Sequence, residues 1–310
     1  MFSKLIAKLP NIALFSSARI PLYVWASLVS QILIVVTGGV VRLTGSGLGC
    51  PTWPKCTEDS FTTVPEMGIH GIIEFGNRTL TGVLLVIALL TLVAAAPQPA
   101  GQRKPVVTPS VALLLLIAAQ AVLGGITVWT GLNPWIVGAH FVLSGIMISI
   151  ASVLVWRVIK PTHQATPFRV YQLSWPIAIF GWISVIVGVM VTGAGPHSGD
   201  ADAGRNGLDL ELWQHLHSYP AYVFLLLALI SLISLLRHDR ALPISNWRSQ
   251  TKVLALLVLV GIGQAIVGVL QSRLGVPAGL VALHMLGASL LISLVTFQWL
   301  SVRGKSAIEA

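Results

Sequence analysis

The sequence predicts an all-α integral membrane protein with eight transmembrane helices, arranged as two tandem four-helix bundles. The chain has 310 residues, of which 55% are apolar and 9% are charged, whereas soluble domains carry roughly 25% charged residues. Eight apolar runs of about twenty residues each are long enough to cross a hydrocarbon core about 30 Å thick. A pattern repeated between the two halves supports the tandem arrangement.

The predicted helices are continuous apolar runs, which favours helices over the alternating strands of a membrane barrel. Lipid cannot satisfy backbone polar groups, so a chain that crosses it must pair them internally. The runs cover residues 22–41, 71–96, 106–128, 136–158, 172–193, 218–237, 251–270 and 280–301.

The charges between the runs predict the orientation of the chain. With the N-terminus inside, fourteen of the nineteen basic residues fall in inner segments and eight of the ten acidic residues on the outer side. This asymmetry is typical of membrane proteins and predicts that both termini are cytoplasmic. The net charge of +9 therefore marks topology and does not indicate a nucleic-acid partner. The N-terminus lacks both a cleavable signal and a transit-peptide pattern, which favours a bacterial plasma membrane.

The two halves of the chain share spaced motifs. Gln120 begins Gln-Ala-Val-Leu-Gly and precedes His140 by twenty residues, and Gln264 begins Gln-Ala-Ile-Val-Gly and precedes His284 by the same distance. We therefore expect an N-terminal unit over residues 1–160 and a C-terminal unit over 161–310. Each holds an even number of helices, so the units should be related by a pseudo-twofold axis along the membrane normal.

Four histidines stand at the outer ends of alternate predicted helices. They are His70, His140, His217 and His284. Four unrelated interfacial histidines are the alternative, but a pair repeated in each half favours a site in the core of each bundle. Paired imidazoles suit a haem iron. Zinc would normally need a third protein ligand, and copper would favour accompanying Met or Cys residues.

The sixth predicted helix offers two candidates, His215 and His217. Two residues along a helix lie on different faces, so both cannot enter one site. Spacing from Thr192 favours His217, by analogy with Thr44 and His70, whereas counting back from His284 slightly favours His215. We take His217 and leave the choice open.

Other residues have both a structural and a functional interpretation. Glu74 lies one turn after His70 and one turn before Arg78, so it is either a proton-transfer group or half of an ion pair. Arg42 either clamps an anionic group such as a haem propionate or anchors a helix end. Cys50 and Cys56 are close enough in an outer loop for one disulfide. Glycines in the helices favour close helix packing; they include Gly38, Gly124, Gly188 and Gly268.

The loop after the first helix carries a specific motif. Residues 42–56 read RLTGSGLGCPTWPKC, and residues 74–78 read EFGNR. The first run, the duplicated halves and their histidines resemble the haem A synthase family over nearly the whole chain. The EFGNR run resembles an actinobacterial-like variant of that family.

This resemblance implies an oxidoreductase that converts the C8 methyl group of haem O to a formyl group, giving haem A for cytochrome oxidase. It implies that His70 and His140 flank the substrate haem O in the first half, whereas His217 and His284 bind a haem b cofactor in the second. It also implies that Glu74 is catalytic. Cys50 and Cys56 match an outer cysteine pair, expected to form a disulfide with a role in electron transfer.

The resemblance further implies a functional link to the farnesyltransferase that makes haem O and to cytochrome oxidase assembly. It leaves room for a homo-oligomer and gives no reason to expect nucleic acid. The haem sites are expected toward the outer face.

One position departs from the family pattern. Many members read Glu-x-x-His-Arg in the second helix, whereas this chain has Asn77 at the histidine position. His70, seven residues earlier on the same helical face, is the expected replacement.

Two other functions fit part of the pattern. A b-type cytochrome subunit that only transfers electrons would explain the histidines, but not Glu74, the cysteine pair or the difference between the halves. A transporter is disfavoured because the segments hold few intramembrane charges and no broken helix with a polar midplane patch.

Overall fold

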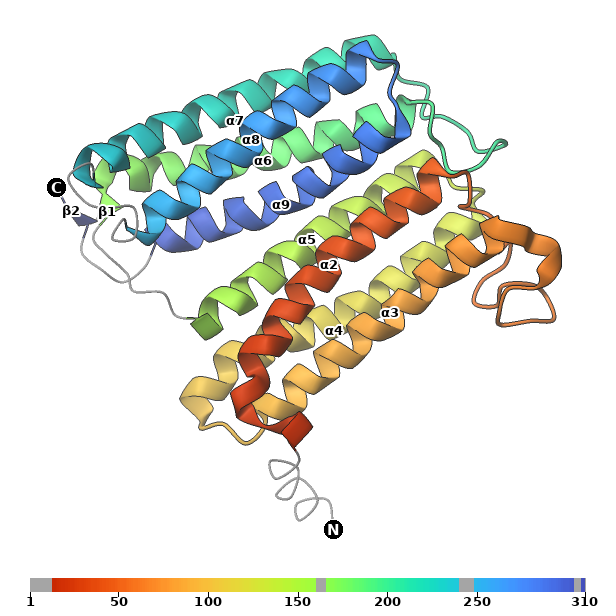
Figure 1. Cartoon of the computed structure of the whole chain (residues 1–310), viewed down its shortest axis with the longest axis horizontal. Coiled ribbons are helices and arrows are strands. Elements are labelled where there is room, and N and C mark those ends of the chain that lie inside the picture. The colour runs from red at the N-terminus through yellow and green to blue at the C-terminus, as the bar shows by residue number, and fades with distance from the viewer. Residues whose placement is uncertain (1–12, 160–165, 240–247, 304–307, 310) are drawn as a thin grey trace. The chain divides into compact units, whose positions relative to one another are not determined.

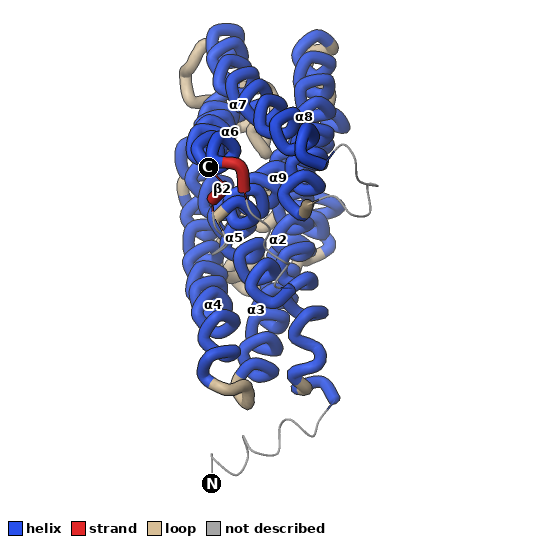
Figure 2. The backbone as a smooth tube through the Cα atoms, turned by 90° about the vertical axis from the view of Figure 1, so that its left-hand side faces the viewer, coloured by secondary structure: helices blue, strands red, loops and turns tan. Residues whose placement is uncertain are grey.

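The computed structural model describes residues 13–159, 166–239, 248–303 and 308–309, and these are almost entirely helical (Figures 1 and 2). The predicted domain boundary at 160–161 lies outside the described residues. So do five of the predicted inner basic residues, namely Lys4, Lys8, Lys160, Arg240 and Lys305.

Within the described residues, eight helices are long and apolar enough to cross a membrane, which confirms the predicted number and identifies a multi-pass membrane protein. They are α2 (Ile20–Leu43), α3 (Gly68–Ala95), α4 (Ala100–Trp129), α5 (Pro134–Ile159), α6 (Phe168–Ala194), α7 (Leu210–Asp239), α8 (Ser249–Arg273) and α9 (Ala278–Val302). Each begins before its predicted apolar run, and all except α3 also end after it, because polar residues near the membrane boundary continue the helical hydrogen bonding. The extension is greatest for α7, which begins eight residues before the predicted start.

Short elements complete the described chain. Three 3₁₀ turns cover Ala13–Phe15 (η2), Ser17–Arg19 (η3) and Pro65–Met67 (η4). Two-residue strands β1 (Thr166–Pro167) and β2 (Ile308–Glu309) pair in parallel.

The chain forms two compact units. Unit 1 comprises Met1–Lys160 together with His197–Gly204, and unit 2 comprises Pro161–Pro196 together with Arg205–Ala310. In unit 1 the helices pack in the closed order α2, α3, α4, α5 and back to α2; unit 2 repeats this order with α6, α7, α8 and α9. In each unit the second and fourth helices therefore face each other across the bundle.

Apolar side chains cover the outside of the helices, as expected for surfaces that contact lipid. Leu115 and Leu259 are each 66% exposed. The core of unit 2 is filled by buried apolar residues from all four helices, among them Ile177, Leu235 and Leu254. The connections 195–209 and 274–277 join the helices at one end of the bundle. The apolar core lies away from that end, which leaves it for polar side chains.

Candidate functional site

A pair of facing histidines lies in the core of unit 2. His217 is the eighth residue of α7 and His284 is the seventh residue of α9. Their ring centroids are 6.2 Å apart, and the ring planes are inclined by 77°. The Nδ1 atoms of both rings are buried without a hydrogen-bond partner among the described residues. His215, the alternative candidate, is exposed.

The separation of the two rings fits a single iron held between them. An imidazole nitrogen binds a metal ion at about 2.0 Å, and the ring centroid lies roughly 1 Å farther away. Two imidazoles on opposite sides of one iron therefore have centroids about 6 Å apart. A ring nitrogen buried without a hydrogen-bond partner is costly, and binding an iron between the rings is one way to offset that cost.

Each histidine of the pair lies against a glycine of the preceding helix. A Cβ atom at Gly188 of α6 would lie 2.9 Å from Cε1 of His217, which is closer than such contacts occur. A Cβ at Gly268 of α8 would lie 3.5 Å from Cε1 of His284, an ordinary contact. The glycines predicted to allow close helix packing thus also provide the space that the imidazole rings occupy.

Unit 1 reproduces half of this arrangement. His140 is the seventh residue of α5 and lies against Gly124 of α4, where a Cβ would come within 3.3 Å of Cε1. Its Nδ1 is also buried without a hydrogen-bond partner among the described residues. Gln120 Nε2 donates to the carbonyl of His140 at 3.1 Å and so ties α4 to α5 beside the ring.

His70 lies in a different environment from the other three histidines. It is the third residue of α3, and its side chain is exposed. Its Nδ1 is 2.8 Å from the Oγ of Ser46, in the loop that follows α2. The four histidines were expected at one depth. His70 is only the third residue of its helix, whereas the other three are the seventh or eighth of theirs, so His70 lies more than one helical turn nearer the end of its helix.

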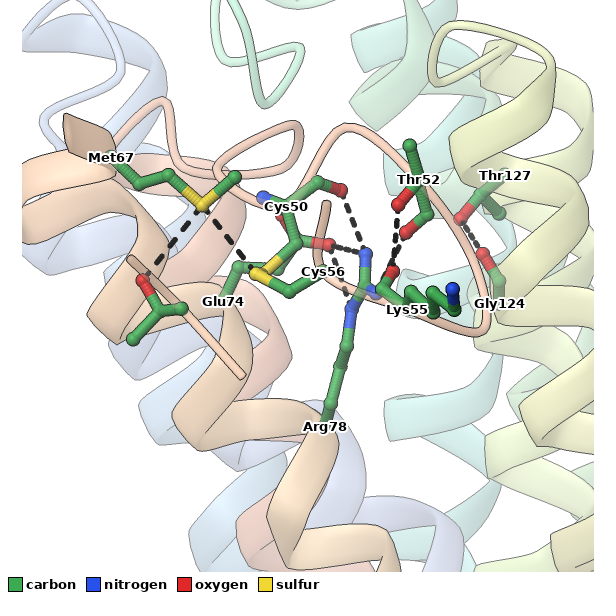
Figure 3. A network of polar contacts seen from close by, with 10 residues as sticks. Cys50, Thr52, Lys55, Cys56, Met67, Glu74, Arg78, Gly124 and Thr127 are labelled. Carbon is green, nitrogen blue, oxygen red and sulfur yellow. Dashed lines mark hydrogen bonds and ion pairs between the residues drawn. A yellow bond between two sulfur atoms is a disulfide. The ribbon is translucent and has the colours of Figure 1, made fainter. Parts of the chain in front are cut away.

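Glu74 and Arg78 hold the loop that follows α2 against α3 (Figure 3). Glu74 is buried and accepts a hydrogen bond from the backbone N–H of Cys50 on one carboxylate oxygen. Its other oxygen accepts from Arg78 Nε at 3.1 Å and from the Nη2 of the same residue. The ion pair expected as one interpretation of Glu74 is therefore present.

Arg78 also reaches three backbone carbonyls of the loop. Its Nη2 donates to the carbonyl of Cys50 at 2.8 Å, and its Nη1 donates to those of Thr52 and Lys55 at 2.9 and 3.2 Å. A planar guanidinium suits this forked arrangement, which a lysine could not reproduce. The sequence spacing indicated the pairing with Glu74 but not these contacts to the loop.

The loop itself is closed by a disulfide between Cys50 and Cys56, as expected. Both cysteines are fully buried, and the sulfur of Met67 lies 3.5 Å from that of Cys56. Trp53 projects from the loop onto α4, where it fills the space left by Gly125 and packs edge-on against Trp129 at 5.4 Å between centroids. Gly125 adjoins Gly124, so Trp53 contacts α4 one residue from the glycine against which His140 lies.

Sequence reasoning missed several of these residues. Ser46, Trp53 and the glycines beside the rings were read only as motif or packing residues. One signal was available, because Gly124 precedes His140 by sixteen residues and Gly268 precedes His284 by the same interval.

Arg42 lies near the end of α2, where its Cγ would be 3.6 Å from a Cβ at Gly199.

The family model for cytochrome oxidase assembly proteins, COX15-CtaA, matches residues 21–296 of this chain. A protein of Alkalihalophilus pseudofirmus named "Heme A synthase" is 24% identical over 292 residues, which cover 90% of this chain and 96% of that protein. A "Heme A synthase" of Bacillus pumilus is 34% identical over 180 residues, covering 53% of this chain and 54% of the relative. One of Lysinibacillus sphaericus is 30% identical over 176 residues, covering 54% and 55%.

The chain thus spans about half the length of two of these relatives and nearly all of the third. The match to the family model runs from the start of α2 into α9 and includes both units. The chain belongs to the COX15-CtaA family of cytochrome oxidase assembly proteins.

Proposed function

We propose that this protein is a haem A synthase, an oxidoreductase that converts the C8 methyl group of haem O to a formyl group and so supplies haem A to terminal oxidases. The observation that carries the proposal is the facing pair of His217 and His284, with centroids 6.2 Å apart and both Nδ1 atoms buried without a hydrogen-bond partner among the described residues. The family membership and the names of the relatives agree with it.

The two units are proposed to have different tasks. In unit 2, His217 and His284 would hold a haem b cofactor, which would supply electron transfer. In unit 1, His140 would bind the iron of the substrate haem O. His70 was also predicted to bind it; its exposure and its contact with Ser46 argue against that role.

Glu74 is proposed as the acidic residue of the reaction. Converting a methyl to a formyl group takes up one oxygen atom, here from water, and releases four protons together with four electrons that pass to an external electron acceptor, so a carboxylate beside the substrate would have a proton to accept. Glu74 is buried and is the seventh residue of α3, as His140 is of α5, which supports a position for the carboxylate near the proposed haem O. The loop closed by Cys50 and Cys56, which Glu74 and Arg78 hold, would cover the substrate side of unit 1 and exclude water.

The charge pattern supports a plasma-membrane location with both termini cytoplasmic and the haem sites toward the outer face. The substrate links the protein to the farnesyltransferase that makes haem O, and the product links it to cytochrome oxidase assembly.

The proposal is tested by purifying the protein after expression with haem O synthase, extracting its pigments and identifying them by chromatography. We expect haem b together with haem O and haem A. H217A and H284A should each lose the low-spin haem b absorbance. A protein that carries haem b but never forms haem A would be an electron-transfer cytochrome, and a colourless protein would exclude both functions.

A further inference from the structure

We propose, on the basis of the function proposed above, that the substrate haem in unit 1 has a single protein ligand, His140, and that Asn77 faces the opposite side of its iron. That side would be left open to a small oxygen ligand, such as water or dioxygen. The iron of the haem in unit 1 would then be able to react, whereas the iron of the haem in unit 2 would only transfer electrons.

The first step is the equivalence of the helices. Both units close in the same order, so α3 and α5 face each other in unit 1 as α7 and α9 do in unit 2. His284 on α9 corresponds to His140 on α5, since each is the seventh residue of its helix and follows its glycine by sixteen residues. The residue of α3 that corresponds to His217 on α7 therefore faces His140.

The second step identifies that residue as Asn77. In unit 2, His217 lies against Gly188, six residues before the end of α6. In unit 1, the Nδ2 of Asn77 is 3.9 Å from a Cβ at Gly38, five residues before the end of α2. Asn77 thus lies beside a glycine of the preceding helix at nearly the same depth, as His140, His217 and His284 do.

The position within the helix separates Asn77 from His70. His217 is the eighth residue of α7; Asn77 is the tenth residue of α3, and His70 is only the third. A rise of 1.5 Å per residue places Asn77 about 3 Å from the depth of His217, and His70 about 7–8 Å from it on the other side. His70 is also exposed and in contact with Ser46.

The third step is chemical. The Oγ1 of Thr37 donates to the Oδ1 of Asn77 at 2.7 Å, which fixes the orientation of the amide. Haem iron is held in proteins by His, Cys, Met or Tyr side chains, and an amide is not among them. A short amide beside the iron would leave space and a hydrogen-bonding group for an exogenous ligand, and such groups decide whether oxygen binds. In unit 2, His217 occupies that position.

The test uses the full-length protein carrying haem b, with purified haem O added, and reads the spin state of each haem by absorbance and electron paramagnetic resonance. We expect one low-spin haem in unit 2 and one high-spin haem in unit 1, and only the latter should bind carbon monoxide when reduced. N77H should convert the second haem to low spin and abolish its carbon monoxide binding. The matched control H70A should change neither spectrum.

The proposal is overturned if the wild-type haem O complex is low spin, binds no carbon monoxide, and becomes high spin in H70A, because His70 would then be the ligand. It is equally overturned if folded N77H and folded N77A both leave the unit 1 haem high spin, because position 77 would then not face the iron. Failure of the proposed function looks different: either the low-spin haem of unit 2 is absent, or added haem O does not bind.

Discussion

At the scale of single residues, glycines determine where the imidazoles lie. The His217 ring packs so closely on α6 that the residue at 188 has no room for a Cβ, whereas the contact between Gly268 and His284 is an ordinary one. The two positions therefore form a natural comparison, since both are glycines facing a proposed haem ligand in the same unit.

We expect G188A to displace the His217 ring and weaken haem b binding. Overpacking of a filled core costs about 1–3 kcal/mol, which corresponds to roughly 5- to 150-fold weaker binding. G268A should change the affinity little, because its new methyl group meets His284 at van der Waals distance. Haem titration followed by absorbance measures both variants. Equal losses, or no loss in G188A, would mean that the contact at Gly188 does not position His217.

At the scale of elements, the feature of interest is the attachment of the 50–56 loop to α3. Glu74 pairs with Arg78, Arg78 donates to three loop carbonyls, and the disulfide closes the loop above them. The carboxylate therefore has a structural task as well as the proposed chemical one. Variants of the two partners separate these tasks.

E74Q should lower haem A formation by about 100-fold or more, as expected for loss of a proton-transfer group. R78K keeps the positive charge but loses the forked geometry, so we expect a looser loop, faster reduction of the Cys50–Cys56 disulfide by added thiol, and a smaller loss of product. Product formation and the rate of reduction are measured side by side. If E74Q loses activity only in proportion to faster disulfide reduction, Glu74 has a structural role alone.

At the scale of the whole molecule, each proposed haem is held by helices of one unit. His140 lies within unit 1, and His217 and His284 within unit 2. We therefore expect two haems per chain in the loaded protein and selective loss on mutation. H140A should lose the haem O of unit 1 and keep the low-spin haem b, whereas H284A should do the reverse.

Haem per chain is measured from the absorbance of extracted haem and the protein concentration. Loss of both haems from either variant would mean that the sites are not independent. H70A serves as the control with an exposed imidazole, and it should retain both haems.

Much of the molecule could be predicted from sequence because the relevant property is local. Whether a run of twenty residues is apolar depends only on those residues. Because lipid offers no hydrogen bonds, such a run must pair its own backbone groups, and a helix does this. The eight helices could be predicted in this way. The disulfide and the family could be predicted from the equally local run of residues 42–56. The equal spacing from Gln120 to His140 and from Gln264 to His284 likewise indicated the repeat.

The tertiary structure was needed wherever the answer depends on how helices are rotated and offset against one another. Counting from Thr44 and Thr192 predicts that His70 and His217 are equivalent, but the segment between α2 and α3 is longer than that between α6 and α7. This difference moves His70 toward the helix end and brings Asn77 to the corresponding depth. Hydropathy does not report the facing of a side chain, so only the packed helices could place His217 on Gly188, Asn77 beside Gly38 and Arg78 on the loop carbonyls.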